Sequence, residues 1–399
     1  MSKLLASTKL GSTSADQMSK TISYYAAFVS LGLVSASLGP TLPGLAENTR
    51  TQLGEIGFLF TARSLGYLIG SVIGGRLFDR VPGHKVMGLM LIAVTILMGF
   101  APLLPQLWLL TLVLLILGAA EGSVDVGGNT LLVWVHRDKV GPFMNGLHFF
   151  FGIGAFLSPL IVAQALLRGG GITGAYWVLG LLVLPVAFWL LRLPSPAVQT
   201  TDTADPSNGR VNHRLVFLIA LFFFLYVGAE IGFGGWIFTY VLKTNLAGES
   251  MAAYLNAGFW GAFTLGRLLA IPIAARLRPR TILATDLAGA LLSIGLIIVG
   301  STSLVATWVG TLGLGLALAS IFPTIISLAE RRMTITGQVT SFFFVGASLG
   351  AMFWPWLMGY LFEAIAPLAM MVTIAGVLVL GLVVFGVLIS FSAHPTEAS

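Results

Sequence analysis

Long apolar stretches separated by short polar breaks make up most of this chain. A helix that crosses the hydrocarbon core of a bilayer needs roughly 20 apolar residues. Division of the sequence at its polar, basic and Gly/Pro breaks predicts twelve such spans, at about 21–45, 53–78, 85–104, 107–135, 141–168, 173–192, 214–243, 250–275, 281–300, 303–329, 337–363 and 367–391. The pattern therefore predicts an all-α membrane protein with twelve transmembrane helices.

One polar segment divides the spans into two sets of six. Residues 193–213 are rich in Pro, Ser, Thr, Asp and Asn and cannot cross a membrane. We expect a linker here, between an N-terminal half at 21–192 and a C-terminal half at 214–391. Residues 1–20 and 392–399 are predicted to be polar tails.

The two halves resemble each other in sequence. Seven residues of the second span recur 200 positions later in the eighth span: Ala62, Leu65, Gly66, Ile73, Arg76, Leu77 and Arg80. Shorter matches at an offset of 196 relate the fifth span to the eleventh and the first to the seventh. Gly and Ala are common in membrane helices and align by chance, but the recurring arginines favour a duplicated six-helix unit. Such a unit is typical of major facilitator transporters.

Composition and charge agree with a membrane protein and fix an expected orientation. The chain is 57% hydrophobic and 9% charged, with a mean hydropathy of +0.95 and no cysteine, whereas soluble domains carry about 25% charged residues. Sixteen of the 21 Lys and Arg residues fall on the side of the N-terminus. The positive-inside rule then predicts that both termini are cytoplasmic, in a multi-pass protein of the plasma (inner) membrane. The polar N-terminal residues lack the features of a signal peptide.

The fourth span carries an unusual polar stripe. Glu121, Asp125 and Asn129 are four residues apart, so a helix places them on one face. A carboxylate at membrane depth is costly and marks a pathway for an ion, proton or polar solute. Asp125 also fits a structural partner of an arginine such as Arg63. Glu121 fits either a second coupling acid or a hydrogen-bond donor between helices.

The loop after the second span carries a recognisable motif. Residues 75–85 read GRLFDRVPGHK, which resembles the major facilitator loop motif with one extra residue. Asp79 and Arg80 would pair with charges of a neighbouring loop in one state of the transporter and separate in the other, acting as a conformational latch. A solvated turn with ordinary positive-inside charges is the alternative.

Six further stretches narrow the resemblance. DVGGN, VGAEIGFGGWIFTY and WGAFTLGR, which begin at Asp125, Val227 and Trp260, are similar to the fucose/glucose/galactose:cation symporter group. LGPTLP, FTARSLG and HFFFGIGAF, which begin at residues 38, 60 and 148, resemble its sodium-dependent glucose transporter 1 branch. The resemblance implies a monosaccharide symporter driven by sodium or protons, without a further cofactor and working as a monomer.

The resemblance also assigns expected roles to residues. Asp125 and Glu230 match membrane acids of the group, and Asn129 matches a companion polar residue. His148 stands where the fucose permease has a sugar-contacting glutamine. The first span lacks the carboxylate that the fucose permease carries there, so cation coupling would rest on Asp125, Glu230, Glu121 or a sodium site.

Other polar and aromatic residues within the spans complete the expected site. The substrate-binding candidates, besides Asn129 and His148, are Asn145, Trp236, Asn256 and Trp260. Arg63 and Arg267 are charges within spans and candidates for a gate. The alternatives are an interhelical hydrogen bond for His148, an interfacial position for the tryptophans and snorkelling for Arg267.

The predicted function is secondary active transport of a glucose-like hexose together with Na+ or H+, by alternating access. Motifs of metalloproteases, phosphate-binding loops and serine hydrolases are absent from the sequence, so we expect no enzyme activity. The net charge of +6 does not indicate a nucleic-acid partner, because the basic residues lie mostly at the ends of the predicted helices. The alternatives are a proton-coupled efflux antiporter for drugs or lipophilic compounds, a sugar sensor without net flux, and a passive facilitator.

Overall fold

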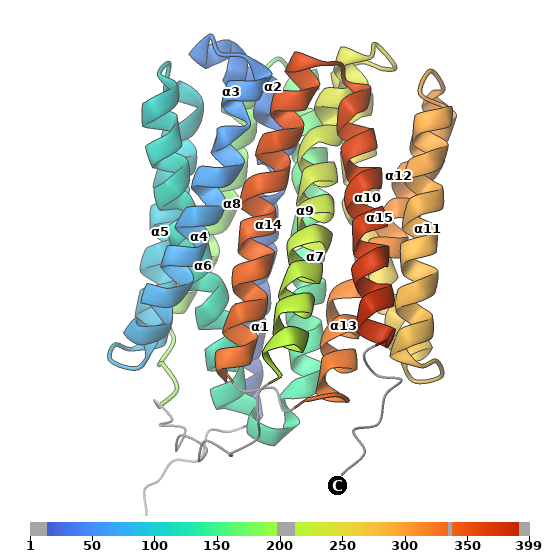
Figure 1. Cartoon of the computed structure of the whole chain (residues 1–399). Coiled ribbons are helices and arrows are strands. Elements are labelled where there is room, and N and C mark those ends of the chain that lie inside the picture. The colour runs from blue at the N-terminus through green and yellow to red at the C-terminus, as the bar shows by residue number, and fades with distance from the viewer. Residues whose placement is uncertain (1–13, 198–211, 334–336, 391–399) are drawn as a thin grey trace, which may run out of the picture.

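The computed structural model describes residues 14–197, 212–333 and 337–390, and these are almost entirely helical (Figure 1). The helices are α1 (Ser14–Ser35), α2 (Leu38–Thr49), α3 (Leu53–Ile56), α4 (Phe58–Phe78), α5 (Gly83–Phe100), α6 (Leu107–His136), α7 (Val140–Leu167), α8 (Gly171–Arg192), α9 (His213–Lys243), α10 (Glu249–Ala274), α11 (Pro279–Val299), α12 (Leu304–Leu318), α13 (Ile321–Glu330), α14 (Gly337–Ala364) and α15 (Leu368–Ser390), with short 3₁₀ turns at Ala101–Leu103 and Arg137–Lys139.

The twelve-span prediction is confirmed. Among the described residues, eleven helices or nearly continuous helix pairs are long and apolar enough to cross a membrane, and α1 with α2 forms a twelfth span bent by 43°. The first span is longer than predicted, because α1 begins at Ser14, inside the expected tail. The linker core at 198–211 and the outer parts of both tails lie outside the described residues.

Two spans are interrupted at positions that proline explains. The α1–α2 bend precedes Pro40 and the α12–α13 break precedes Pro323. A proline cannot donate to the carbonyl four residues earlier, and its ring clashes with that carbonyl. The affected carbonyls belong to Ala36 and Ala319, which lie in the two interruptions.

Close helix contacts hold each half together. In the N-terminal half, a methyl group on Gly66 of α4 would lie 1.9 Å from the Leu115 carbonyl oxygen of α6, and one on Gly118 of α6 would lie 2.0 Å from the Arg63 carbonyl oxygen. Only glycine permits this backbone approach, which is a common way for membrane helices to associate. It also brings Arg63 against α6, where the polar stripe lies.

The two ends of the bundle differ. We call the end where α1 begins and α15 ends the terminal face, and the end with α2 and α3 the opposite face (Figure 1). Near the opposite face the halves are in contact: Leu53 N donates to the Glu363 carboxylate at 3.1 Å, and a methyl group on Gly39 would lie 2.8 Å from the Gly234 carbonyl oxygen. At the terminal face the last turn of α10 and the loop that follows it, residues 271–278, are exposed throughout. The bundle is therefore closed at the opposite face and parted at the terminal face.

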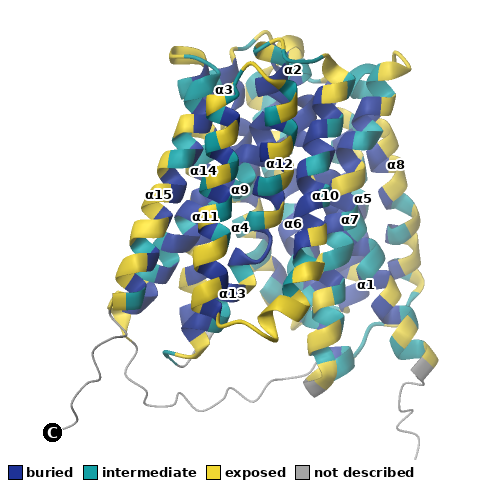
Figure 2. Ribbon diagram, turned by 90° about the vertical axis from the view of Figure 1, so that its right-hand side faces the viewer, coloured by how far each residue is buried: buried dark blue, intermediate teal, exposed yellow. Residues whose placement is uncertain are grey.

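The exterior is apolar, as a protein in lipid requires. Large hydrophobic side chains such as Leu292, Val299 and Val305 are more than 70% exposed on the outside of α11 and α12. Figure 2 shows the exposed positions around the outside of the bundle and the buried ones within it.

Candidate functional site

Glu121 and Arg63 form a buried ion pair in the N-terminal half. Arg63 of α4 donates from Nε and Nη2 to the two carboxylate oxygens of Glu121 on α6, at 2.7 and 2.6 Å. The same guanidinium donates to the carbonyl oxygens of Val34 and Ser35, at 2.8 and 3.2 Å. These carbonyls lie at the end of α1, beside the bend; the Val34 oxygen also accepts from the amide and the hydroxyl of Ser37, at 3.2 and 2.7 Å. Arg63 thus neutralises Glu121 and caps α1 at the same time.

Asp125, one turn further along α6, has no basic partner. Among the described residues its carboxylate forms no ion pair, and its polar neighbours are the hydroxyl of Tyr67 on α4 and the side chain of Asn129. Asn129 Nδ2 also donates to the Asp125 backbone oxygen at 2.9 Å. The alternative in which Arg63 pairs with Asp125 is not what the structure shows, since Arg63 is engaged by Glu121.

A second charged group lies in the C-terminal half and faces the first half across the bundle. Glu230 of α9 is half-buried, with the Tyr226 hydroxyl in hydrogen-bonding reach and Arg267 of α10 within electrostatic range. Arg267 also interacts with His148 of α7, which belongs to the other half. Its guanidinium carbon lies 4.5 Å above the ring of Phe263. Arg267 therefore lies within electrostatic range of a residue in each half, Glu230 and His148.

One face of α10 continues this region towards the opposite face. Asn256, Trp260, Thr264 and Arg267 are spaced to share a face, and Thr264 packs directly against Gly152 of α7. Asn256 Nδ2 donates to the Gly234 oxygen at 2.6 Å, whereas Asn256 Oδ1 and Trp260 Nε1 are buried without a described partner. Buried polar atoms without a partner are rare and call for an explanation; a bound polar solute is one.

The remaining predicted residues are spread over the bundle. Trp236 is fully buried, donates from Nε1 to the Pro355 oxygen at 2.8 Å and packs beside Gly57 of the other half. It therefore belongs to the closed contact near the opposite face. Asn145 is exposed, one turn before His148. Asp79 and Arg80 are exposed at the end of α4, and neither is in an ion pair among the described residues.

Sequence reasoning missed a further acid in the spans, besides Glu121, Asp125 and Glu230. Asp286 of α11 is half-buried and accepts a hydrogen bond from the Ser320 hydroxyl at the α12–α13 break. The signal was available, because Asp286 is the one acidic residue of its predicted span. The rule that singled out Asp125 applies to it equally.

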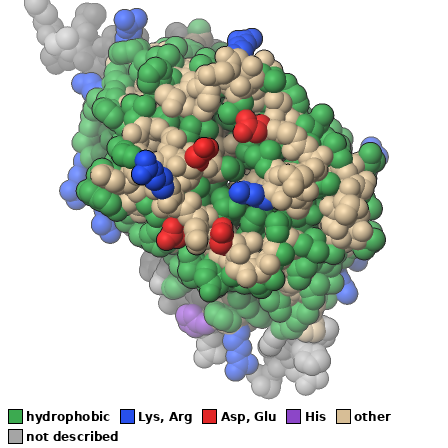
Figure 3. Space-filling view, turned by 90° about the horizontal axis from the view of Figure 1, so that it is seen from above, with side chains coloured by type: hydrophobic (Ala, Val, Ile, Leu, Met, Phe, Trp, Pro, Cys, Tyr) green, Lys and Arg blue, Asp and Glu red, His purple; other side chains and the backbone are tan. Residues whose placement is uncertain are grey.

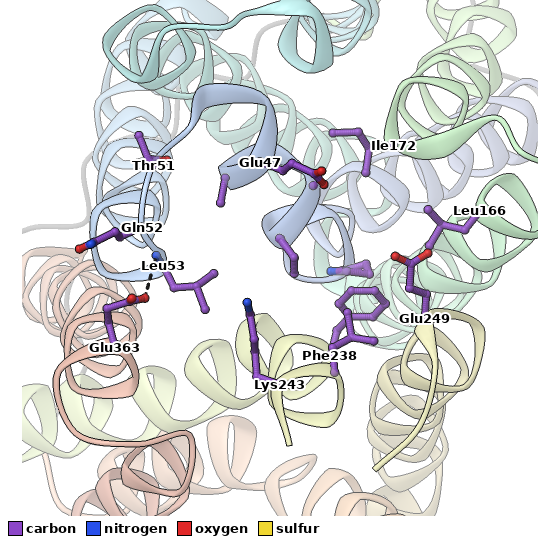
Figure 4. Close-up of a pocket in the computed structure, with 15 residues that line it drawn as sticks. Glu47, Thr51, Gln52, Leu53, Leu166, Ile172, Phe238, Lys243, Glu249 and Glu363 are labelled. Atoms are coloured by element: carbon purple, nitrogen blue, oxygen red, sulfur yellow. Dashed lines mark hydrogen bonds between the residues drawn. The ribbon is translucent and has the colours of Figure 1, made fainter. Parts of the chain in front are cut away.

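A pocket at the opposite face was also missed. It measures about 490 Å³ and is lined by residues of both halves, including Glu47, Lys243, Glu249 and Glu363. Figure 3, viewed from this face, shows acidic and basic side chains near the centre of a largely uncharged surface. In Figure 4, Lys243 points into the pocket between Glu47 and Glu363, and Glu363 bonds the backbone of Leu53. The pocket lies above the contact that closes the bundle.

Comparison with known proteins identifies the family. The model of the Major Facilitator Superfamily matches residues 24–355 of the chain. The chain belongs to this superfamily. It is 35% identical over 356 residues to sodium-dependent glucose transporter 1 of Xenopus laevis, covering 82% of this chain and 72% of the relative. It is 34% identical over 373 residues to the human protein of that name, covering 84% and 72%.

Solved structures support the same fold. The nucleoside transporter NupG superimposes with a TM-score of 0.75 at 15% identity, covering 94% of this chain and 99% of that one. A bacterial homologue of the human lysosomal transporter Spinster, in an inward-facing and occupied conformation, also superimposes with a TM-score of 0.75. The identity is 14%, and the match covers 97% of this chain and 99% of that one. The predicted major facilitator fold and the resemblance to the glucose transporter branch are confirmed. The chain is a membrane transporter and not an enzyme.

Proposed function

We propose that this transporter carries a glucose-like hexose across the membrane together with Na+. Relatives named sodium-dependent glucose transporter 1, more than 30% identical over most of the chain, support the sugar and the ion. No comparable similarity supports the efflux antiporter.

One geometric observation carries the proposal. Support comes from Arg267, which interacts electrostatically with Glu230 of its own half and with His148 of the other, and from the unsatisfied atoms Asn256 Oδ1 and Trp260 Nε1 further along the same face of α10. A hexose presents many hydroxyl groups that both donate and accept, and its C–H faces stack on aromatic rings. Mixed acceptors, donors and an indole in one region suit such a solute better than a lipophilic one.

The ion would make transport directional by neutralising an acid. Asp125 lacks a basic partner, and an uncompensated charge is costly to carry through a closed state of the bundle. Occupation of an acid by a cation removes that cost, so the empty and the doubly loaded carrier would exchange faces most readily. Glu121 does not need this compensation because Arg63 provides it.

The direction of opening follows from the same proposal. With both termini cytoplasmic, as the Lys and Arg distribution predicts, the parted terminal face is the inner one. The structure then corresponds to an inward-facing state, and the pocket around Lys243 and Glu363 is an outer vestibule.

Uptake of radiolabelled glucose into proteoliposomes, with sodium and pH gradients imposed separately, tests the proposal. We expect accumulation above equilibrium with an inward sodium gradient and none with a pH gradient alone. Uptake that stops at equilibrium would indicate a passive facilitator. Accumulation driven by a proton gradient alone would show that the coupling ion is H+ and not Na+. Absence of uptake would remove hexose as the substrate.

A further inference from the structure

The break between α12 and α13 gathers oxygen atoms that the proposed transport cycle has not used. Pro323 leaves the carbonyl of Ala319 without a helical donor. The last carbonyl groups of α12, up to Leu318, and the carbonyl of Ala319 lie at this break, and past it the amide of Thr324 donates to the carbonyl of Ser320 at 3.1 Å. These groups form the C-terminal end of α12, which carries the negative pole of the helix dipole.

A carboxylate lies beside these carbonyls. Asp286 reaches the break from α11 and accepts the hydrogen bond of Ser320, the residue between the two helices. It is in no ion pair among the described residues. The break therefore combines one acid, one hydroxyl and the carbonyl oxygens at the end of α12, about 10 Å along α11 from its first residue by helix rise.

Comparison of the two halves shows that the α12–α13 break lacks a positive charge that the N-terminal half has at the related level. Gly66 packs against Leu115 and Ala119 of α6, and its repeat partner Gly266 packs against Leu316 and Ala319 of α12. Ala119 and Ala319 are related by the offset of 200 and Leu115 and Leu316 by 201, so α6 and α12 correspond to within one residue.

The same offset places Ser320 at the level of Ala120, next to Glu121. At this level the N-terminal half holds the guanidinium of Arg63, but the position related to Arg63 is Phe263. The C-terminal half thus has an acid and a cluster of carbonyls without the positive charge that balances the acid of the other half.

We propose that Asp286, Ser320 and the carbonyl groups at the α12–α13 break bind Na+. Discontinuous membrane helices commonly coordinate sodium through the carbonyls at their broken ends, and the ion would supply the charge that Arg63 supplies in the other half. In the ion-free state the Ser320 hydroxyl donates to Asp286 and closes the site; on binding, its oxygen turns to the ion. The inference rests on the proposed function, because the ion is the co-transported one.

Tyr226 connects this site to the region between the halves. Its hydroxyl donates to the Leu318 carbonyl at 3.1 Å and lies near Glu230, Arg267 and Asp286. A tyrosine has one proton to donate. An ion that binds the Leu318 carbonyl would free the Tyr226 hydroxyl, which keeps its proton, to donate its hydrogen bond to Glu230, one turn along α9. Sodium binding would in this way change the hydrogen bonding of an acid that faces the sugar.

Binding of ²²Na+ to the purified full-length transporter, without sugar, tests the site. We expect saturable binding to the unmodified protein, loss of saturable binding in Asp286→Asn, and a five- to tenfold weaker apparent affinity in Ser320→Ala. Thr285→Val is the matched control, because the hydroxyl of Thr285 bonds only carbonyls of its own helix. Glu249→Gln controls for loss of a negative charge elsewhere.

The variants also separate this inference from the proposed function. Asp286→Asn should still exchange hexose between the two sides in counterflow, and this exchange also shows that the variant is folded. If Asp286→Asn does not fold, sodium binding by Ser320→Ala tests the site instead. Normal sodium binding by both variants would overturn the inference, even with sodium-driven uptake intact. Loss of sodium binding in Asp125→Asn but not in Asp286→Asn would move the site to α6. Sodium binding at Asp286 without any hexose transport would leave the site in place and refute the substrate.

Discussion

The buried pair of Arg63 and Glu121 gives a prediction whose size follows from its contacts. Replacement of Glu121 by Leu removes two short charged hydrogen bonds and leaves a guanidinium buried without its counter-charge. Breaking a buried pair by removal of one partner costs about 3–5 kcal/mol. A change of 1 kcal/mol shifts the melting temperature of a large domain by about 2 °C, so we expect Tm to fall by about 6–10 °C.

The double variant separates pairing from other effects. Arg63→Met alone should be destabilising to a similar extent, because it leaves Glu121 unpaired and removes the guanidinium donor from the carbonyls of Val34 and Ser35, of which Val34 still accepts from Ser37. Arg63→Met combined with Glu121→Leu leaves no unpaired charge, and the carbonyl that loses its described donor is that of Ser35, at a cost of about 1–3 kcal/mol. The double variant should therefore be no less stable than either single variant, which is strong non-additivity.

Thermal unfolding of the purified protein in detergent, followed by intrinsic tryptophan fluorescence, measures these shifts, with Glu249→Gln as a surface control. Additive effects of the two substitutions would refute the reasoning, as would a Glu121→Leu protein that melts within 1 °C of the unmodified one. Transport by the double variant adds a second test. If sodium-driven accumulation persists, Glu121 acts only as a partner of Arg63; if accumulation is lost while exchange remains, Glu121 takes part in cation coupling.

Three further predictions address coupling, binding and orientation. Asp125→Asn should abolish accumulation of hexose against its gradient but keep counterflow exchange, because it removes the uncompensated charge; full accumulation would exclude Asp125 from coupling. Trp260→Phe keeps an aromatic ring but removes the unpaired Nε1 donor. The KM for hexose uptake should therefore rise about three- to tenfold, as expected for loss of one hydrogen bond. An unchanged KM would exclude Trp260 from the sugar site. Since the chain has no cysteine, Ser207→Cys in the linker and Ser250→Cys in α10 can be labelled without background by an impermeant maleimide added to intact cells. We expect labelling of the second only, and the reverse would invert the orientation.

The course of the spans could be read from the sequence, because the requirement for apolar length acts on each segment separately. The interruptions were also encoded, since Pro40 and Pro323 each disable the carbonyl four residues before. Recognition of a long apolar segment does not by itself reveal such a break. The predicted spans at 21–45 and 303–329 therefore ran through positions where the structure bends or separates the helix.

The partners of the charged side chains were beyond the sequence. Whether Arg63 meets Glu121 or Asp125 depends on the relative rotation and height of α4 and α6, which the glycine contacts at Gly66 and Gly118 fix. The same applies to Trp236, whose aromatic ring suited a sugar site but which packs in the contact that closes the bundle. The residue type determines which interactions a side chain can form, and helix packing determines which neighbour it forms them with.

The two halves descend from one pattern yet treat charge differently, and this difference bears on how a cation can drive transport. In the N-terminal half Arg63 neutralises Glu121 permanently, so the pair stiffens the junction of α1, α4 and α6. In the C-terminal half a helix is broken at the related level, and Asp286 has no arginine. A permanent counter-charge cannot respond to the concentration of an ion, whereas an acid that lacks one responds directly. Coupling therefore requires acids without a permanent counter-charge. Within the described spans, Asp125 and Asp286 are acids of this type, with no base nearby.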